Sequence, residues 1–164
     1  MDKDMREKLL RLIEKDSRLT VDDLAVMLDL TPAVVAETIQ HFEANKIICG
    51  YHTLVNWDKA DDDQVSAVIE LKVNPQRGAG FDKIAERVYQ YPEVDAVYLM
   101  SGAYDLLVEM RKAPMKEIAN FVASRLSTIE EVQSTSTHFI LKRYKDHGTL
   151  FVDEEGDKRM VVSP

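Results

Sequence analysis

Residues 19–35, LTVDDLAVMLDLTPAVV, contain two helix start signals in close succession. At the first, the Thr20 hydroxyl can accept a hydrogen bond from an early helical N–H while Asp23 bonds back, as in a capping box. At the second, Thr31 is followed by Pro32, and proline at the first helical position loses no hydrogen bond. Only two residues separate the first of these helices from the cap of the second. So short a connection predicts a helix-turn-helix.

The segments on either side of this stretch extend it into a small helical domain. Apolar residues recur at helical spacing before and after the turn, with charged residues between them. Residues 47–55 follow as an apolar, β-rich stretch broken by Cys49-Gly50, which predicts a small strand or wing. We therefore expect a winged helix-turn-helix domain over residues 1–56 and a polar linker over 57–64. The predicted core contains Met5, Leu9, Leu12, Ile13, Leu24, Ala25, Leu28, Val35, Ile39 and Phe42.

From residue 65 onward the pattern changes to strands that alternate with helices. The order is β-α-β-β-α-β, which is the ferredoxin-like arrangement. The fold class is therefore α+β, with a ferredoxin-like domain expected over residues 65–145. Residues 146–164 form a tail that is predicted to be hairpin-like, around an acidic turn at Gly156. The predicted strands are 65–73, 94–100, 105–110 and 132–144, and the predicted helices are 81–91 and 114–126.

The composition of the chain also limits which classes of protein it can belong to. The chain has 164 residues, and its 29 Asp and Glu outnumber its 21 Lys and Arg, so its formal net charge is −8. An acidic chain argues against a nucleic-acid binder, whose usual footprint is basic. Apolar runs fall far short of the roughly 20 residues that span a bilayer, and the charged N-terminus is unlike a secretory signal. These features predict a cytoplasmic protein.

The sequence offers little for catalysis or metal binding. The single cysteine, Cys49, cannot form an internal disulfide. The four histidines are scattered, without Cys or carboxylate partners at metal-ligand spacing. Ser101 precedes a glycine but lies in no Gly-x-Ser-x-Gly elbow. We therefore expect no enzymatic activity, no metal and no cofactor.

The chain as a whole resembles the leucine-responsive and asparagine-operon regulators, the Lrp/AsnC family. The resemblance implies a sequence-specific DNA-binding transcription regulator that assembles as a homodimer, often as an octamer, through its C-terminal domain. It also implies that this domain binds a small effector, typically an amino acid, where subunits meet. The tail beyond residue 145 is longer than the family's pattern. The stretches that carry the resemblance are LTVDDLAVMLDLTPAVV (19–35), FEANKIICGYHTLV (42–55), YPEVDAVYLMSGAYDLLVEM (91–110) and VQSTSTHFILKRYK (132–145).

The second helix of a helix-turn-helix lies in the major groove and presents its outward residues to the bases. Gln40 can pair with adenine through two hydrogen bonds, and Thr38 can bond a base or a phosphate. Ala33 and Val34 could contact a thymine methyl group. The candidate DNA-binding residues are Thr31, Ala33, Val34, Glu37, Thr38, Gln40, His41 and Lys46.

This helix lacks the positive charge that DNA binding ordinarily uses. Residues 31–43 contain no Lys or Arg and two Glu, although the family commonly places Lys or Arg around positions 37, 38, 40 and 41. Glu37 would repel a nearby phosphate, although it could accept from a cytosine amino group. Two interpretations remain open. Either phosphates are held from elsewhere, or DNA binding is weak or lost and the protein is a ligand-binding oligomeric partner. The cations before the linker and outside this helix are Lys3, Arg6, Lys8, Arg11, Lys15, Arg18 and Lys46.

The turn at residues 101–105, SGAYD, is the most distinctive local feature of the second domain. Glycine allows a tight turn whose exposed N–H groups can hold a carboxylate, and Asp105 could pair with an α-ammonium group. A plain β-hairpin capped by Asp105 is the alternative interpretation. Gln133, Thr135 and Thr137 alternate along the last strand and so share one face, and the resemblance implies that such a strand from a neighbouring subunit completes the pocket. The candidate effector-binding residues are Ser101, Gly102, Ala103, Tyr104, Asp105, Gln133, Thr135 and Thr137.

Overall fold

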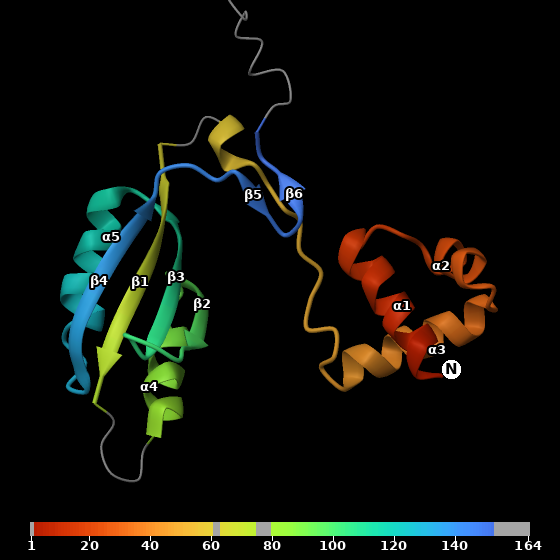
Figure 1. The fold of residues 1–164 in the computed structure, drawn as a ribbon, viewed down its shortest axis with the longest axis horizontal. Coiled ribbons are helices and arrows are strands. Elements are labelled where there is room, and N and C mark those ends of the chain that lie inside the picture. The colour runs from red at the N-terminus through yellow and green to blue at the C-terminus, as the bar shows by residue number, and fades with distance from the viewer. Residues whose placement is uncertain (1, 61–62, 75–79, 153–164) are drawn as a thin grey trace, which may run out of the picture. The chain divides into compact units, whose positions relative to one another are not determined.

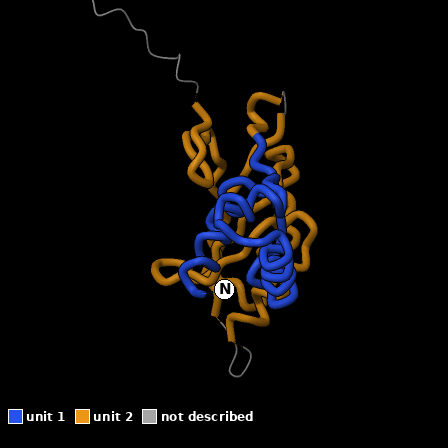
Figure 2. The backbone as a smooth tube through the Cα atoms, turned by 90° about the vertical axis from the view of Figure 1, so that its right-hand side faces the viewer, with its two compact units in different colours: residues 1–55 blue, residues 56–164 orange. Residues whose placement is uncertain are grey.

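Two structural units make up the chain, residues 1–55 and residues 56–164 (Figure 2). The structure is a computed structural model and describes residues 2–60, 63–74 and 80–152. None of the helices in these described ranges is long and apolar enough to cross a membrane.

Three helices form the first unit (Figure 1): α1 (Lys3–Lys15), α2 (Val21–Leu28) and α3 (Pro32–Ala44). The predicted helix-turn-helix is therefore present, with α2 and α3 as its two helices. Each helix repeats its apolar residues at helical spacing, so the three apolar faces meet in one core. The buried members of this core are Leu9, Ile13, Leu24, Ala25, Leu28, Val35 and Phe42, and Met5, Leu12 and Ile39 lie half-buried at its margin.

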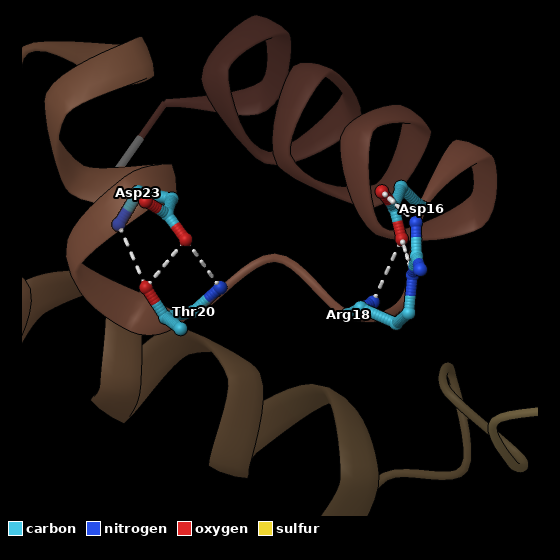
Figure 3. Close-up of polar contacts among 4 residues, drawn as sticks. All are labelled: Asp16, Arg18, Thr20 and Asp23. Atoms are coloured by element: carbon cyan, nitrogen blue, oxygen red, sulfur yellow. Dashed lines mark hydrogen bonds and ion pairs between the residues drawn. The ribbon is translucent and has the colours of Figure 1, made fainter.

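The start of α2 is fixed by the capping box that the sequence predicts (Figure 3). The Thr20 hydroxyl oxygen accepts a hydrogen bond from the Asp23 N–H at 3.1 Å, and the Asp23 carboxylate accepts one from the Thr20 N–H at 2.9 Å. The hydroxyl also donates to that carboxylate at 2.6 Å. These bonds, the one from the hydroxyl first, lower the pKa of Asp23. At the other end of α2, Asp29 adopts a left-handed φ of 54°, which ends the helix and allows the turn into α3.

Thr20→Ala should lower the free energy of unfolding by about 1 kcal/mol, because an N-cap threonine contributes roughly that amount. Urea unfolding followed by circular dichroism measures the loss. Thr31→Ala is the matched control at the start of α3. The Thr31 hydroxyl accepts from the Val34 N–H at only 3.5 Å, so its removal should cost less. An equal or larger loss in Thr31→Ala would contradict this ranking of the two caps.

The segment after α3 forms no strand among the described residues 45–56, so the strand expected within residues 47–55 is absent. Instead, the Ile47 N–H donates to the Phe42 carbonyl at 2.8 Å, and the Tyr51 hydroxyl donates to the Glu43 carboxylate at 2.8 Å. Burial and the Glu43 carboxylate raise the pKa of Tyr51. These bonds fold the segment back onto the end of α3. A short 3₁₀ helix, η1 (Trp57–Lys59), follows at the start of the second unit.

A four-stranded antiparallel sheet with two helices forms the body of the second unit (Figure 1). The spatial order of its strands is β2-β3-β1-β4, which confirms the predicted ferredoxin-like βαββαβ arrangement. Both helices pack against the same face of the sheet, and the second continues into a π-helical turn, Val122–Leu126. The elements are β1 (Val65–Val73), α4 (Gly80–Tyr89), β2 (Val94–Leu99), β3 (Leu106–Ala113), α5 (Met115–Phe121) and β4 (Val132–Ile140).

The register of the sheet separates a helix-covered face from an open face. Leu71 in β1 pairs with Leu106 in β3 on one side and with Thr135 in β4 on the other. Residues opposite each other in paired strands point to the same face, and Leu71 and Leu106 are fully buried against the helices. The alternate residues therefore form the open face. They include Ser66, Val68, Glu70, Lys72, Tyr98, Leu107, Glu109, Ser134, Ser136 and His138.

The C-terminal end of the described chain differs from the sequence prediction. The last strand of the sheet ends at Ile140, and a short separate hairpin follows. Its turn has positive φ at His147 and Gly148, 43° and 78°, as a two-residue type I′ turn requires. This hairpin is not the one predicted around the acidic turn at Gly156, and that turn lies outside the described residues. The strands of the observed hairpin are β5 (Lys145–Asp146) and β6 (Thr149–Leu150).

Candidate DNA-reading helix and effector site

The candidate DNA-reading residues line the outer surface of α3 and the turn that follows it. Val35 and Phe42 anchor the opposite face of the helix in the core. Thr38 is half-buried, and its hydroxyl donates to the Val34 carbonyl at 2.7 Å. Because this bond uses the only proton of the hydroxyl, Thr38 can accept from a base amino group but has no donor left for a phosphate. The exposed candidates are Thr31, Ala33, Val34, Glu37, Gln40, His41 and Lys46.

Asn45, which ends α3, contacts the His41 ring and indicates its tautomer. The Asn45 side-chain nitrogen donates to the His41 carbonyl at 2.8 Å, which fixes the orientation of the amide. The same nitrogen lies 3.2 Å from His41 Nδ1. Because an amide nitrogen can only donate, Nδ1 accepts and the neutral ring carries its proton on Nε2. His41 therefore presents an N–H donor on a helix that has no Lys or Arg.

Positive charge in the first unit lies on α1 and on the loops. Two arginines are already paired: Arg11 with Glu7 at 2.7 Å, and Arg18 with Asp16 at 3.2 Å in the loop before α2 (Figure 3). Lysines without an ion pair are the groups best placed to neutralise phosphates, because no internal carboxylate competes for them. Within the described residues 2–55, these lysines are Lys3, Lys8, Lys15 and Lys46.

The turn at residues 101–105 joins β2 to β3. It is closed by the Met100 N–H, which donates to the Asp105 carbonyl at 2.8 Å. Gly102 has a φ of 144°, and a Cβ added there would meet no atom within 4 Å. The glycine is therefore required by the backbone conformation and not by lack of space. No backbone N–H of residues 101–104 donates to another part of the chain that the structure describes, and residues 101–103 are exposed.

The carboxylate of Asp105 is held by β1. One oxygen accepts from the Val73 N–H at 2.9 Å, and the other accepts from Lys72 Nζ at 3.1 Å. The Asp105 N–H in turn donates to the Leu71 carbonyl at 3.0 Å. The Val73 N–H first, and then the Lys72 ammonium, lower the pKa of Asp105. Asp105 thus links the start of β3 to the end of β1. These contacts agree with the alternative interpretation, in which Asp105 caps a plain β-hairpin.

The three candidate residues of β4 are separated from this turn by one strand. Thr135 and Thr137 pair with Leu71 and Ile69, so both point to the helix-covered face and are half-buried. The register shifts between Lys72 and Val73, and this bulge interrupts the alternation of β4 at Gln133, which is exposed. The expectation that all three residues continue one regular alternation is therefore wrong at Gln133.

Lys72 is a residue that the sequence prediction missed at this site. It lies on the open face of β1, and its contact with Asp105 depends on β1 lying beside β3. The alternation of β1 indicates that Lys72 points away from the core, but not which strand it reaches. Among the described residues there is no cluster of three or more His, Cys, Asp or Glu that could hold a metal ion.

A helix-turn-helix domain joined to a ferredoxin-like domain with an exposed turn defines the class of ligand-responsive transcription regulators. The sequence profile of the Lrp/AsnC ligand binding domain matches residues 66–150, and that of a winged helix-turn-helix DNA-binding domain matches residues 3–48. The chain belongs to the Lrp/AsnC family and is a transcription regulator with a DNA-binding and a small-molecule-binding domain.

Relatives and solved structures agree with this assignment. The chain is 44% identical over 158 residues to the uncharacterised HTH-type transcriptional regulator YugG of Bacillus subtilis (strain 168), covering 96% of this chain and 95% of that protein. The crystal structure of an AsnC family transcriptional regulator from Agrobacterium tumefaciens has a TM-score of 0.69 at 25% identity, covering 92% and 96% of the two chains. The fold is also that of the transcriptional regulator NMB0573 from Neisseria meningitidis, solved as a complex with L-Met, with a TM-score of 0.70 at 24% identity and coverage of 89% and 93%.

Proposed function

We propose that this protein is a homodimeric regulator that reads DNA with α3 and changes its assembly or its DNA binding when a small carboxylic acid, such as an amino acid, binds between subunits. One observation carries the proposal. α3 exposes its candidate reading residues on a helix-turn-helix whose core and caps are complete, within the same chain as a domain of the ligand-binding type.

The proposed DNA contacts divide into base readers and phosphate holders. Gln40 can bond adenine, and Val34 can pack against a thymine methyl group. The Nε2–H of His41 can donate to a base acceptor or a phosphate without bringing a charge. Phosphates are held by the lysines outside the reading helix, because that helix has no cation of its own. The proposed phosphate holders are Lys3, Lys8, Lys15 and Lys46.

The open face of the second unit supports a homodimer. Val68 and Leu107 are apolar residues at its centre, and Tyr98 lies beside them with its side chain exposed. Both helices lie on the opposite face. A groove of about 1040 Å³ runs between this face and the segment around residues 142–147. A second copy packed against this face would bury the apolar residues and fill the groove, and further pairing of dimers would give an octamer.

The effector is proposed to bind at the turn of residues 101–105, with Thr135, Thr137 and Gln133 of a neighbouring subunit's β4 completing the pocket. The N–H groups of residues 101–104 support this placement, because they make no hydrogen bond among the residues that the structure describes and N–H groups of such a turn can hold a carboxylate. A regulator that reads chromosomal DNA works in the cytoplasm, which is the proposed location of this protein.

The proposed function is tested by measuring, with fluorescence anisotropy, how the protein binds the DNA upstream of its own gene. We expect sequence-selective binding that weakens steeply as salt is raised, because several phosphates are neutralised. An unrelated fragment of the same length is the control. If no binding is detected at micromolar protein, the proposal that the protein regulates by binding DNA is overturned. A ligand-binding partner protein is then favoured, in line with the absence of Lys and Arg from α3.

A further inference from the structure

Asn45 makes two contacts with His41, and together they fix which way the Asn45 amide points. Its side-chain nitrogen donates to the His41 carbonyl at 2.8 Å and lies 3.2 Å from Nδ1 of the His41 ring. The reversed amide would bring two oxygens together at the 2.8 Å contact with no proton between them. The two protons of the amide nitrogen therefore serve the carbonyl and Nδ1, and both come from the residue that ends α3.

The His41 ring is left with one unused polar group, its Nε2–H. Because Nδ1 accepts from Asn45, the neutral ring carries its proton on Nε2. Among the residues that the structure describes, none bonds Nε2, and Glu37, one helical turn earlier, makes no ion pair with the ring. His41 is exposed. A neutral N–H donor thus lies on the outer surface of a helix that has no Lys or Arg.

The tautomer of this ring decides which groups of DNA it can bond. An N–H donor is complementary to O6 and N7 of guanine in the major groove, and to the phosphate oxygens of every nucleotide. The opposite tautomer would present a lone pair outward. A lone pair repels those acceptors and can bond only the amino group of cytosine or adenine. The contact with Asn45 therefore selects the form of His41 that attracts an acceptor.

We propose that Asn45 is a positioning residue for DNA recognition. It holds the neutral His41 ring as an N–H donor toward an acceptor on the DNA, either a guanine edge or a phosphate, and does not itself contact the DNA. The inference rests on the proposed reading of DNA by α3. It deepens that function, because it assigns to a pair of uncharged side chains the donor that a helix without Lys or Arg otherwise lacks.

Asn45→Asp reverses the tautomer with almost no change of shape. A carboxylate only accepts, so Nδ1 becomes the donor and Nε2 the acceptor. The change also adds a negative charge and removes the bond to the His41 carbonyl. It is therefore made twice, in the wild-type chain and in a His41→Ala chain, because these two costs are the same in both and cancel in the comparison.

Fluorescence anisotropy of the full-length protein with its own upstream DNA measures the four affinities. The pH is 8.5, where histidine rings are ordinarily neutral. We expect Asn45→Asp to weaken binding about tenfold more when His41 is present than in the His41→Ala chain, because a hydrogen bond is replaced by a repulsion. In a control chain with His52→Ala, another exposed histidine, Asn45→Asp should cost as much as in the wild type.

The two kinds of acceptor are separated by substituting each base pair of the bound DNA in turn. If His41 reads guanine, His41→Ala loses a preference for guanine at one position of the site, and Asn45→Asp moves that preference to cytosine or adenine. If His41 bonds a phosphate, His41→Ala weakens binding to all sequences equally. Either result supports the proposal.

Nitrogen NMR of protein labelled in histidine reads the tautomer directly and without DNA. We expect the proton of His41 on Nε2 in the wild type and on Nδ1 in Asn45→Asp. A wild-type proton on Nδ1, or equal losses from Asn45→Asp with and without His41, would overturn the inference and leave Asn45 as the end of α3 alone. If the wild-type protein binds no DNA while its tautomer is the expected one, the proposed function itself fails, which is a distinct outcome.

Discussion

Leu107→Asp should leave the protein monomeric at micromolar concentration. Leu107 lies in β3 at the centre of the open face, between Tyr98 of β2 and Glu70 of β1. A symmetric dimer would bury two new carboxylates in its interface, one from each subunit, beside the existing Glu70 and Glu109. An unpaired buried carboxylate costs several kcal/mol, so the dimerisation constant should fall by about 100-fold or more. Sedimentation velocity measures the change directly.

The fold of the variant should survive, because Leu107 faces away from the core that the helices cover. Ala119→Asp is the matched control: it adds the same charge to an exposed position on α5, on the other side of the sheet, and should leave the dimer intact. A Leu107→Asp protein that remains dimeric at the concentration where the wild type is dimeric would show that the open face is not the interface.

The proposed dimer would matter for DNA binding because one α3 can read only one half-site. Two copies of the helix, separated by about one turn of DNA, read two half-sites at once and gain specificity from their spacing. An effector that binds where subunits meet can change this spacing only if it binds one arrangement of the subunits more tightly than another. In this way the proposed effector site and the reading helix would be coupled through assembly, without requiring a contact between the two units of one chain.

Local patterns were sufficient to predict the helical unit. The capping box at Thr20 and Asp23 and the proline after Thr31 are signals within a few residues, and the bonds they predict are the ones observed. The strand expected within residues 47–55 is absent for a different reason. An apolar, β-rich stretch specifies an extended segment, but its partner here is the end of α3, through Tyr51 and Glu43, and not another strand. Tertiary bonds of this kind leave no local signal.

The candidate sites also combine features that local sequence patterns predict with features that depend on the folded sheet. The outward face of α3 follows from helical periodicity alone, because the buried residues Val35 and Phe42 define the inner face. The role of Asp105 could not be derived locally, since its partners Lys72 and Val73 lie in a strand more than thirty positions earlier in the chain. The bulge at Gln133 likewise depends on the register between β4 and β1. Such pairings are properties of the folded sheet and not of either strand.

Glu37→Arg should tighten the binding of DNA of any sequence. Glu37 is exposed on α3, in a stretch of the helix where the other glutamate, Glu43, already accepts the Tyr51 hydroxyl. Replacing this carboxylate with a guanidinium removes a repulsion and adds one phosphate contact. Each such contact steepens the dependence of the logarithm of affinity on the logarithm of salt by about 0.9. At low salt we expect roughly tenfold tighter binding to an unrelated fragment. Fluorescence anisotropy across a salt series measures both quantities.

The control must separate this local effect from a change in the net charge of the protein. Glu86→Arg makes the same charge change on the exposed surface of α4 in the ligand-binding domain, where no DNA contact is proposed. It should leave the salt slope unchanged, and at physiological salt it should alter affinity little, because surface charges farther away than a Debye length, about 8 Å at that salt, are screened. If both variants tighten binding equally, the net negative charge of the whole chain weakens DNA binding, and the result gives no evidence that α3 contacts the DNA. If only Glu37→Arg does so, the chain binds DNA through α3 despite its acidic charge, and Glu37 holds non-specific affinity down so that base contacts decide where the protein binds.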